Sequence, residues 1–243
     1  MLKNYIRVAL RSIFRNKLTA FINIAGLALA MMCCILIFLF IADELSYDRY
    51  NSKADRTYRV TRDFLSNDGV VNLRLANVAP PIGPLLQNDF GEIEVMARTI
   101  NLGVNIGLEE NGETKNFDEE SLFAAEPGIF KIFDIDVITG NKATALVRPH
   151  TVMLSEKTAE KLFGTENVVG KRLLANDQFD LEVTGVYKDF PKQAHWHPDY
   201  LLSFSSMEDK EIYGRKAWKR TGATMPLVRT SYWRKELNLK PWK

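Results

Sequence analysis

The sequence is poor in the residues that carry catalysis or cross-link small exported domains. Its two cysteines, Cys33 and Cys34, are adjacent, so no disulfide framework can join distant parts of the chain. It has three histidines and neither a His-Glu-x-x-His nor a Gly-x-Ser-x-Gly motif. The 32 Lys and Arg nearly balance the 30 Asp and Glu, and these charges are scattered, which argues against nucleic-acid binding. This composition predicts a protein that is not an enzyme and that relies on its own hydrophobic core.

The chain also has few long hydrophobic runs: only one is long enough to span a membrane. Residues 24–42 contain no charged side chain, and as a helix they would cover roughly the 30 Å of a bilayer's hydrocarbon core. We therefore predict an uncleaved membrane helix at residues 22–43. The alternatives are a signal peptide, whose apolar region is usually shorter and ends in a small-x-small site, and a buried helix of a soluble protein.

The charges that flank this run predict its orientation. Five basic residues and no acid precede it: Lys3, Arg7, Arg11, Arg15 and Lys17. Three acids follow it: Asp43, Glu44 and Asp48. Since basic residues are retained on the cytoplasmic side, the N-terminus is predicted inside the cell and the rest of the chain outside.

Residues 1–21 have a pattern of their own. Apolar side chains recur at spacings of three and four, from Leu2 and Tyr5 to Leu18 and Phe21, and the basic residues occupy other faces. This pattern predicts an amphipathic elbow helix that lies against membrane lipid, with its cations at anionic headgroups. The alternative is a basic leader that only sets the membrane topology.

Residues 44–214 alternate strand-like and helical segments and predict a mixed α+β domain. Strand-like runs cover residues 56–65, 70–75, 94–100 and 104–108, with turn signals at residues 67–69 and 111–112. A helical pattern begins near residue 82, and residues 126–140 are typical of a short helix followed by a strand up to residue 138. The clearest unit is a strand at 152–154, an N-cap at Ser155, a helix to Phe163 and a C-cap at Gly164. A strand pair is expected around residues 176–177.

Two motifs resemble chemical sites only in part. Residues 164–172 have the glycines and lysine of a phosphate loop, but the spacing is wrong and Arg172 stands where a hydroxyl is needed. A helix C-cap followed by a turn explains the same glycines. His195, His197 and Asp199 alternate, so on a strand they would share a face that could bind zinc. The favoured alternative is the exposed start of a strand.

Several segments together resemble one family. They are RNKLTAFINIAGLALA and ELSYDRYNSKADRTYRV around the apolar run, VMLSEKTAEKLFG, and VTGVYKDFPKQAHWHPDYLLSF. In this order they resemble the permease subunits of macrolide-export (MacB/FtsX-like) and lipoprotein-release ABC transporters, over residues 1–214. The resemblance implies a bacterial inner-membrane protein with a periplasmic core domain that works as a dimer. It also implies a partner ABC ATPase, which binds the ATP, and a periplasmic adaptor or lipoprotein; no cofactor belongs to this chain.

In such a permease, motion of the membrane helix would pass to the periplasmic domain through a helix-to-domain joint. We assign this role to Asp43, Glu44, Tyr47, Asp48 and Tyr50, followed by Arg56 and Tyr58. The competing class is a single-span anchored periplasmic binding or scaffold module without transport activity. A membrane-anchored metallohydrolase is a third class.

Residues 215–243 depart from the family pattern. They carry nine Lys or Arg against one acid, Glu236, and three of the four tryptophans. We expect an atypical basic tail, either the truncated or out-of-frame ending of a longer permease or a genuine segment that binds anionic surfaces.

Overall fold

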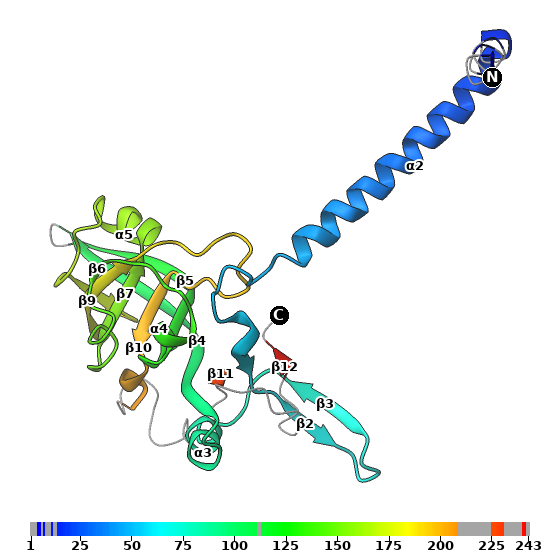
Figure 1. Ribbon diagram of the computed structural model, residues 1–243. Coiled ribbons are helices and arrows are strands. Elements are labelled where there is room, and N and C mark those ends of the chain that lie inside the picture. The colour runs from blue at the N-terminus through cyan, green and yellow to red at the C-terminus, as the bar shows by residue number, and fades with distance from the viewer. Residues whose placement is uncertain are drawn as a thin grey trace. The chain divides into compact units, whose positions relative to one another are not determined.

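The computed structural model describes residues 4–5, 7, 11, 14–110, 113–208, 225–230 and 240–241 (Figure 1). The chain divides into two compact units, Met1–Tyr47 and Asp48–Lys243. In the first unit, helix α2 runs from Lys17 to Glu44 and none of its residues is buried. It is long and apolar enough to cross a membrane, and its 28 residues would span about 42 Å.

Helix α2 ends in a short turn. The Leu45 N–H donates to the Ile41 carbonyl over 2.9 Å, and the Ser46 hydroxyl donates to the Asp43 carbonyl over 2.6 Å. These bonds satisfy carbonyl groups that lack a partner at the end of any helix. The helix begins at Lys17, whereas the predicted membrane segment begins at residue 22, so the boundary between elbow and anchor stays a prediction.

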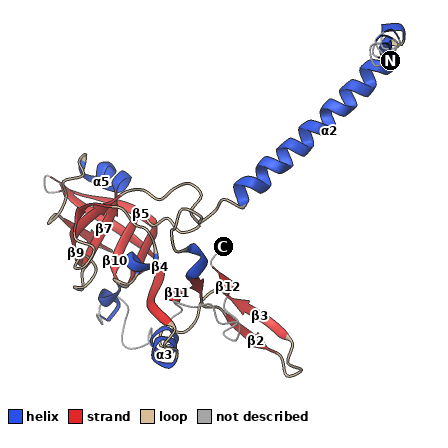
Figure 2. Cartoon of the chain, viewed as in Figure 1, coloured by secondary structure: helices blue, strands red, loops and turns tan. Residues whose placement is uncertain are grey.

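The second unit is a mixed α+β domain, which confirms the predicted fold class (Figure 2). Its large sheet has the order β12-β1-β11-β4-β5-β10-β7-β9-β6, with β8 paired to β4 and β9. The strands are β1 (Thr57–Arg59), β4 (Ile93–Glu110), β5 (Glu113–Ala125), β6 (Val137–Gly140), β7 (Thr151–Ser155), β8 (Arg172–Ala175), β9 (Phe179–Tyr187), β10 (Tyr200–Ser203), β11 (Met225–Thr230) and β12 (Lys240–Pro241). Strand β10 is parallel to β5, and β7 is parallel to β9; the other pairs are antiparallel.

Alternating side chains of the central strands divide the core between the two faces of this sheet. On β7, Val152 and Leu154 belong to one buried cluster and Met153 to the other. Helix α5 (Glu156–Phe163) packs Ala159 into the first cluster, and helix α4 (Ile129–Ile132) packs into the second. A third cluster gathers β1, the start of β4 and helix α3 (Ile82–Asp89).

The unit around α5 forms as the sequence predicts. The Ser155 hydroxyl accepts a hydrogen bond from the Thr158 N–H, and Gly164 ends the helix with a φ of 64°. Asn176 and Asp177 have φ values of 50° and 56° and form the turn between β8 and β9. The glycines of residues 164–172 thus include a helix C-cap, as the interpretation against a phosphate loop requires.

Other elements differ from the prediction in extent. The two runs expected at residues 94–100 and 104–108 form one strand, β4, with an irregularity between Leu102 and Val104. The turn expected at residues 111–112 lies outside the described residues. Strands β11 and β12 come from the segment expected to be a tail, and the domain boundary at residue 214 stays a prediction.

A separate two-stranded hairpin, β2 (Arg62–Leu65) and β3 (Val71–Leu75), follows β1. Its turn holds Gly69 at a φ of 76°, and the Ser66 N–H donates to the Val70 carbonyl over 2.8 Å. The predicted turn at residues 67–69 is therefore confirmed. Figure 1 shows the hairpin projecting from the large sheet of the domain.

Candidate functional site

The candidate site is the segment at the start of the second unit, residues 48–53, which we call the clasp segment. Asp48 is 3% exposed and has a φ of 59°, a left-handed conformation that Asp tolerates better than most residues. Its Oδ1 accepts the His195 backbone N–H over 3.0 Å, and its Oδ2 lies 2.8 Å from His195 Nδ1. Its own N–H donates to the Gln193 carbonyl over 2.8 Å. Asp48 therefore fixes the clasp segment to the loop between β9 and β10.

A second set of bonds fixes the same segment to the loop after α4. The Asn51 side-chain oxygen accepts the Asp134 N–H over 3.1 Å, and Asp134 Oδ2 accepts the Ser52 N–H over 2.6 Å. The Lys53 ammonium donates to the Lys131 carbonyl over 3.1 Å and lies 3.8 Å from Asp134 Oδ1. Because the Asn51 side chain accepts from Asp134 and the Asp134 side chain accepts from Ser52, the two backbones are held side by side.

Aromatic rings pack beside these bonds. The Tyr50 ring meets Phe190 edge to face at 6.3 Å, and Phe190 meets Trp196 in the same way at 5.5 Å. Trp196 also stacks on Phe133 at 5.1 Å and is 4% exposed. Such pairs contribute about 0.5–1.5 kcal/mol each beyond their buried area. The clasp segment is thus continuous with the second buried cluster of the domain.

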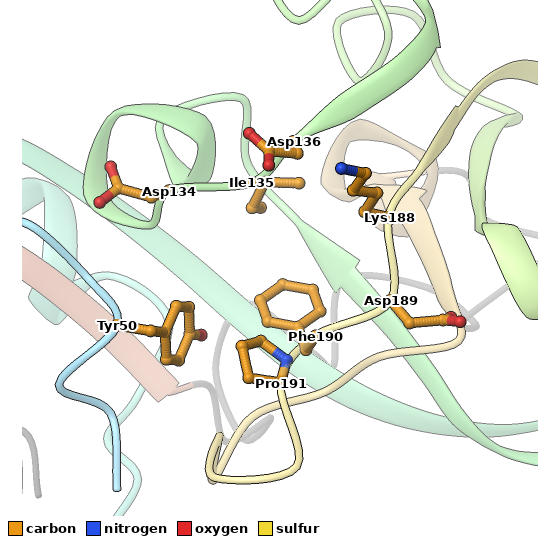
Figure 3. A pocket seen from close by; sticks show the side chains of 8 residues that line it. All are labelled: Tyr50, Asp134, Ile135, Asp136, Lys188, Asp189, Phe190 and Pro191. Atoms are coloured by element: carbon orange, nitrogen blue, oxygen red, sulfur yellow. The ribbon is translucent and has the colours of Figure 1, made fainter. Parts of the chain in front are cut away.

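A pocket of about 250 Å³ opens between the clasp segment and the two loops that hold it. Figure 3 shows Tyr50 facing Phe190 and Pro191 across it, with Asp134 and Asp136 on another side. Burial raises the pKa of Tyr50 to about 12, the Asn51 side chain offsets part of the rise, and Asp48 and Asp134 add to it. The Tyr50 hydroxyl therefore stays protonated at neutral pH.

Asp134 makes the stability of this region dependent on acid pH. Burial by itself would raise the pKa of its carboxyl group, but hydrogen bonds from Ser52 and the nearby Lys53 and Lys142 outweigh it and lower the pKa. A lowered pKa stabilises the folded state fully above the unfolded value of about 3.9, and this contribution is lost as the pH falls through the folded value.

We expect the free energy of unfolding of Asp134→Asn to fall less steeply than that of the wild type as the pH is lowered below about 4. Unfolding by urea at a series of pH values measures this slope. Asp136→Asn is the matched control, since Asp136 lines the same pocket without bonding to the clasp segment. Equal slopes for wild type and Asp134→Asn would contradict the role of Asp134.

The residues predicted to form the joint range from exposed to fully buried. Asp43 and Glu44 are exposed in the last turn of α2, and Tyr47 is half-buried in the first unit. Arg56 lies 3.6 Å from Glu94, and Tyr58 is 2% exposed in the core, with its hydroxyl donating to the Asp55 carbonyl over 3.3 Å. Within the second unit, Asp48 and Tyr50 are the predicted residues that meet at the clasp.

The predicted elbow residues are described only in part. Arg7, Arg11, Arg15 and Lys17 are exposed, and Lys3 lies outside the described residues. Exposure is what contact with headgroups requires, but the membrane role of these side chains stays a prediction.

The prediction of an exposed strand start at residues 195–199 is confirmed in part, because His195 and His197 are exposed but strand β10 begins only at Tyr200. These residues form a loop before β10, Trp196 is buried among aromatic rings, and His195 is a partner of Asp48. No group of three metal-binding side chains occurs among the described residues. The sequence did not indicate Asp134, Phe190 and His195 as partners of the clasp segment, because the hydrogen bonds of Asp134 and His195 to it join residues 82 and 147 positions apart.

Fold and joint together define a mixed α+β domain on a chain with one apolar N-terminal helix. A model of the MacB-like periplasmic core domain family matches residues 20–229. The chain belongs to this family, which confirms the resemblance to MacB/FtsX-like ABC transporter permeases. No curated protein compared with the chain matches it.

Solved structures share the fold. A domain of a permease protein from Porphyromonas gingivalis is 23% identical, with a TM-score of 0.63 over 79% of this chain and 80% of that one. The periplasmic region of MacB from Actinobacillus actinomycetemcomitans is 13% identical, with a TM-score of 0.53 over 76% and 79%. The extracellular domain of the noncanonic ABC-type transporter YknZ from Gram-positive bacteria is 19% identical, with a TM-score of 0.50 over 72% and 84%.

Proposed function

We propose that this chain is a permease subunit of an ABC exporter of the macrolide-export or lipoprotein-release kind. Its N-terminus lies in the cytoplasm, α2 crosses the inner membrane, and the core domain stands in the periplasm. Membership of the family implies a partner ABC ATPase and a dimeric permease. The ATPase would hold the ATP, and the permease would carry the resulting motion outward to an adaptor or a lipoprotein.

The observation that carries this proposal is the double fixation of the clasp segment. A connection that transmits motion must hold its first residues firmly to the part that is moved. The hydrogen bonds of Asp48 to the loop before β10 and of Asn51 to the loop after α4 support this role for residues 48–53. A flexible tether would suit the competing class, an anchored binding or scaffold module, equally well or better.

The test has two parts: it identifies the protein that binds this chain, and it measures whether ATP changes the core domain. The full chain, tagged and purified from membranes, is expected to bring down a cytoplasmic ABC ATPase. A stable complex with envelope proteins alone would favour the anchored module and overturn the transport assignment.

In the complex with the ATPase, ATP is expected to change hydrogen exchange of amides in the core domain. Inserting four glycines between Leu45 and Ser46 should abolish this change while the ATPase stays bound, since the insertion interrupts the chain ahead of the clasp. A matched control inserts four glycines between Asp68 and Gly69, at the tip of the hairpin. An ATP-dependent change that survives the first insertion contradicts force transmission through the clasp segment.

A further inference from the structure

The pocket beside the clasp segment carries two charged groups that the clasp does not use. Asp136 and Lys188 line this pocket of about 250 Å³, and both are exposed. Figure 3 shows the Lys188 ammonium turned toward Asp136 on one side of the pocket. Within the described part of the chain, neither side chain forms a hydrogen bond or an ion pair. One acid and one base are therefore available to a ligand.

The other side of the pocket is apolar. Figure 3 shows the rings of Tyr50, Phe190 and Pro191 there. The remaining carboxylates of the lining are placed differently: Asp134 accepts the Ser52 N–H of the clasp segment, and Asp189 points away from the rings. A ligand in this pocket thus meets an apolar wall on one side and a pair of opposite charges on the other.

The volume of the pocket limits the size of its ligand. About 250 Å³ corresponds to roughly eight water molecules at about 30 Å³ each. Drug-sized ligands occupy pockets of about 300–1,000 Å³. The pocket therefore suits a ligand of roughly eight to ten non-hydrogen atoms, which is the size of a free amino acid.

Charge, apolar surface and size together match one chemical class. An α-amino acid carries a primary ammonium and a carboxylate on the same carbon, so it can bind a neighbouring acid and base at once. An apolar side chain on that carbon can then pack against the rings, where it leaves water. Peptide ends, simple amines and fatty acids each carry only one of the two charges.

From this arrangement we propose that the pocket binds a free α-amino acid with an apolar side chain. Its ammonium pairs with Asp136, its carboxylate pairs with Lys188, and its side chain packs against Tyr50 and Phe190. Tyr50 belongs to the clasp segment, and the other three residues belong to the loops that hold it. The bound amino acid therefore stabilises the clasp. This goes beyond the proposed function, since a transport subunit and an anchored module can both carry such a pocket.

Calorimetric titration of the detergent-solubilised full chain with leucine tests the site. Leucine is expected to bind with a Kd of about 1 mM or below. Leucinamide lacks the carboxylate and 4-methylpentanoate lacks the ammonium, so each should bind roughly two- to fivefold more weakly. Glycine, which lacks the apolar side chain, should also bind more weakly. No binding of leucine, or equal binding of leucine and either analogue, would overturn the proposal.

Two variants assign the charges. Asp136→Asn should weaken leucine binding roughly two- to fivefold and leave the affinity for 4-methylpentanoate unchanged, because that probe has no ammonium. Lys188→Gln should weaken leucine binding to a similar extent and leave the affinity for leucinamide unchanged. The control is Lys157→Gln, at an exposed lysine on α5, which should bind leucine as the wild type does. A pocket variant that binds leucine normally, or one that weakens all probes alike, contradicts this assignment.

Hydrogen exchange measures the effect on the clasp. Saturating leucine should slow the exchange of amides in residues 48–53 and leave those of the β2–β3 hairpin unchanged, because a ligand stabilises the segments that it joins. Thermal unfolding without leucine checks that the variants are folded. Unchanged exchange in residues 48–53 while leucine is bound would show that the ligand does not stabilise the clasp.

Discussion

Asp48→Val is expected to lower the free energy of unfolding of the core domain by about 4 kcal/mol or more, the largest effect of any single change in the clasp segment. Two causes add. The variant loses hydrogen bonds from the His195 backbone and ring to a carboxylate that is 3% exposed, each typically worth about 1.5–3 kcal/mol. It also places a β-branched residue at a φ of 59°, which costs about 1–3 kcal/mol. Urea unfolding of the detergent-solubilised full chain measures the loss.

Two further variants separate these causes. Asp48→Asn tolerates the left-handed backbone and keeps an oxygen for the His195 N–H, so it should cost roughly 1–2 kcal/mol. His195→Ala keeps the backbone bond and removes the ring, so it should also cost less than Asp48→Val. If all three variants unfold alike, Asp48 does not hold the clasp segment in the way that the geometry indicates.

Hydrogen exchange gives the same prediction a local form. Opening of residues 48–53 should become faster in Asp48→Val, while amides in β7, which is paired with β10 on one side and β9 on the other, keep their order of protection. A uniform loss of protection across the domain would mean that Asp48 supports the whole fold and not the joint in particular.

Local signals predicted the parts of the fold that local chemistry decides. Ser155 and Gly164 delimit α5 because a hydroxyl cap and a left-handed glycine act within a few residues of each helix end. Gly69 marks the hairpin turn for a similar reason, since it occupies a conformation that other residues rarely adopt. In each case the residue type and the backbone it requires occur at the same position.

The sequence indicates where the clasp segment lies but not how it is built. Acids just after an apolar run are typical of the exit from a membrane, which is why a joint is predicted at Asp48. Asp48 is buried against His195, which lies 147 positions further along the chain. The periodicity of a sequence gives no information about a contact over that separation. The sequence HWHPD misled for the same reason: its alternation favours a strand, but the environment of Trp196 is set by Phe123, Phe133 and Phe190, which come from three other segments.

The second large effect is expected at that tryptophan. Trp196→Ala should lower the free energy of unfolding by about 3–5 kcal/mol, because it removes a large side chain from a packed cluster that cannot close around the cavity. The indole N–H makes no hydrogen bond to the residues that the structure describes. Trp196→Phe, which keeps a ring in place, should therefore cost no more than about 2 kcal/mol.

The variant also tests whether cluster and clasp act together. Phe190 contacts both Tyr50 and Trp196, and His195 precedes Trp196 in the chain, so loss of the indole should loosen the loop that holds Asp48. In a double-mutant cycle, Trp196→Ala and Asp48→Val should then cost less together than the sum of their separate effects, by about 1 kcal/mol or more. Simple addition would mean that the aromatic cluster stabilises the domain independently of the joint, and that the stiffness of residues 48–53 comes from their hydrogen bonds alone.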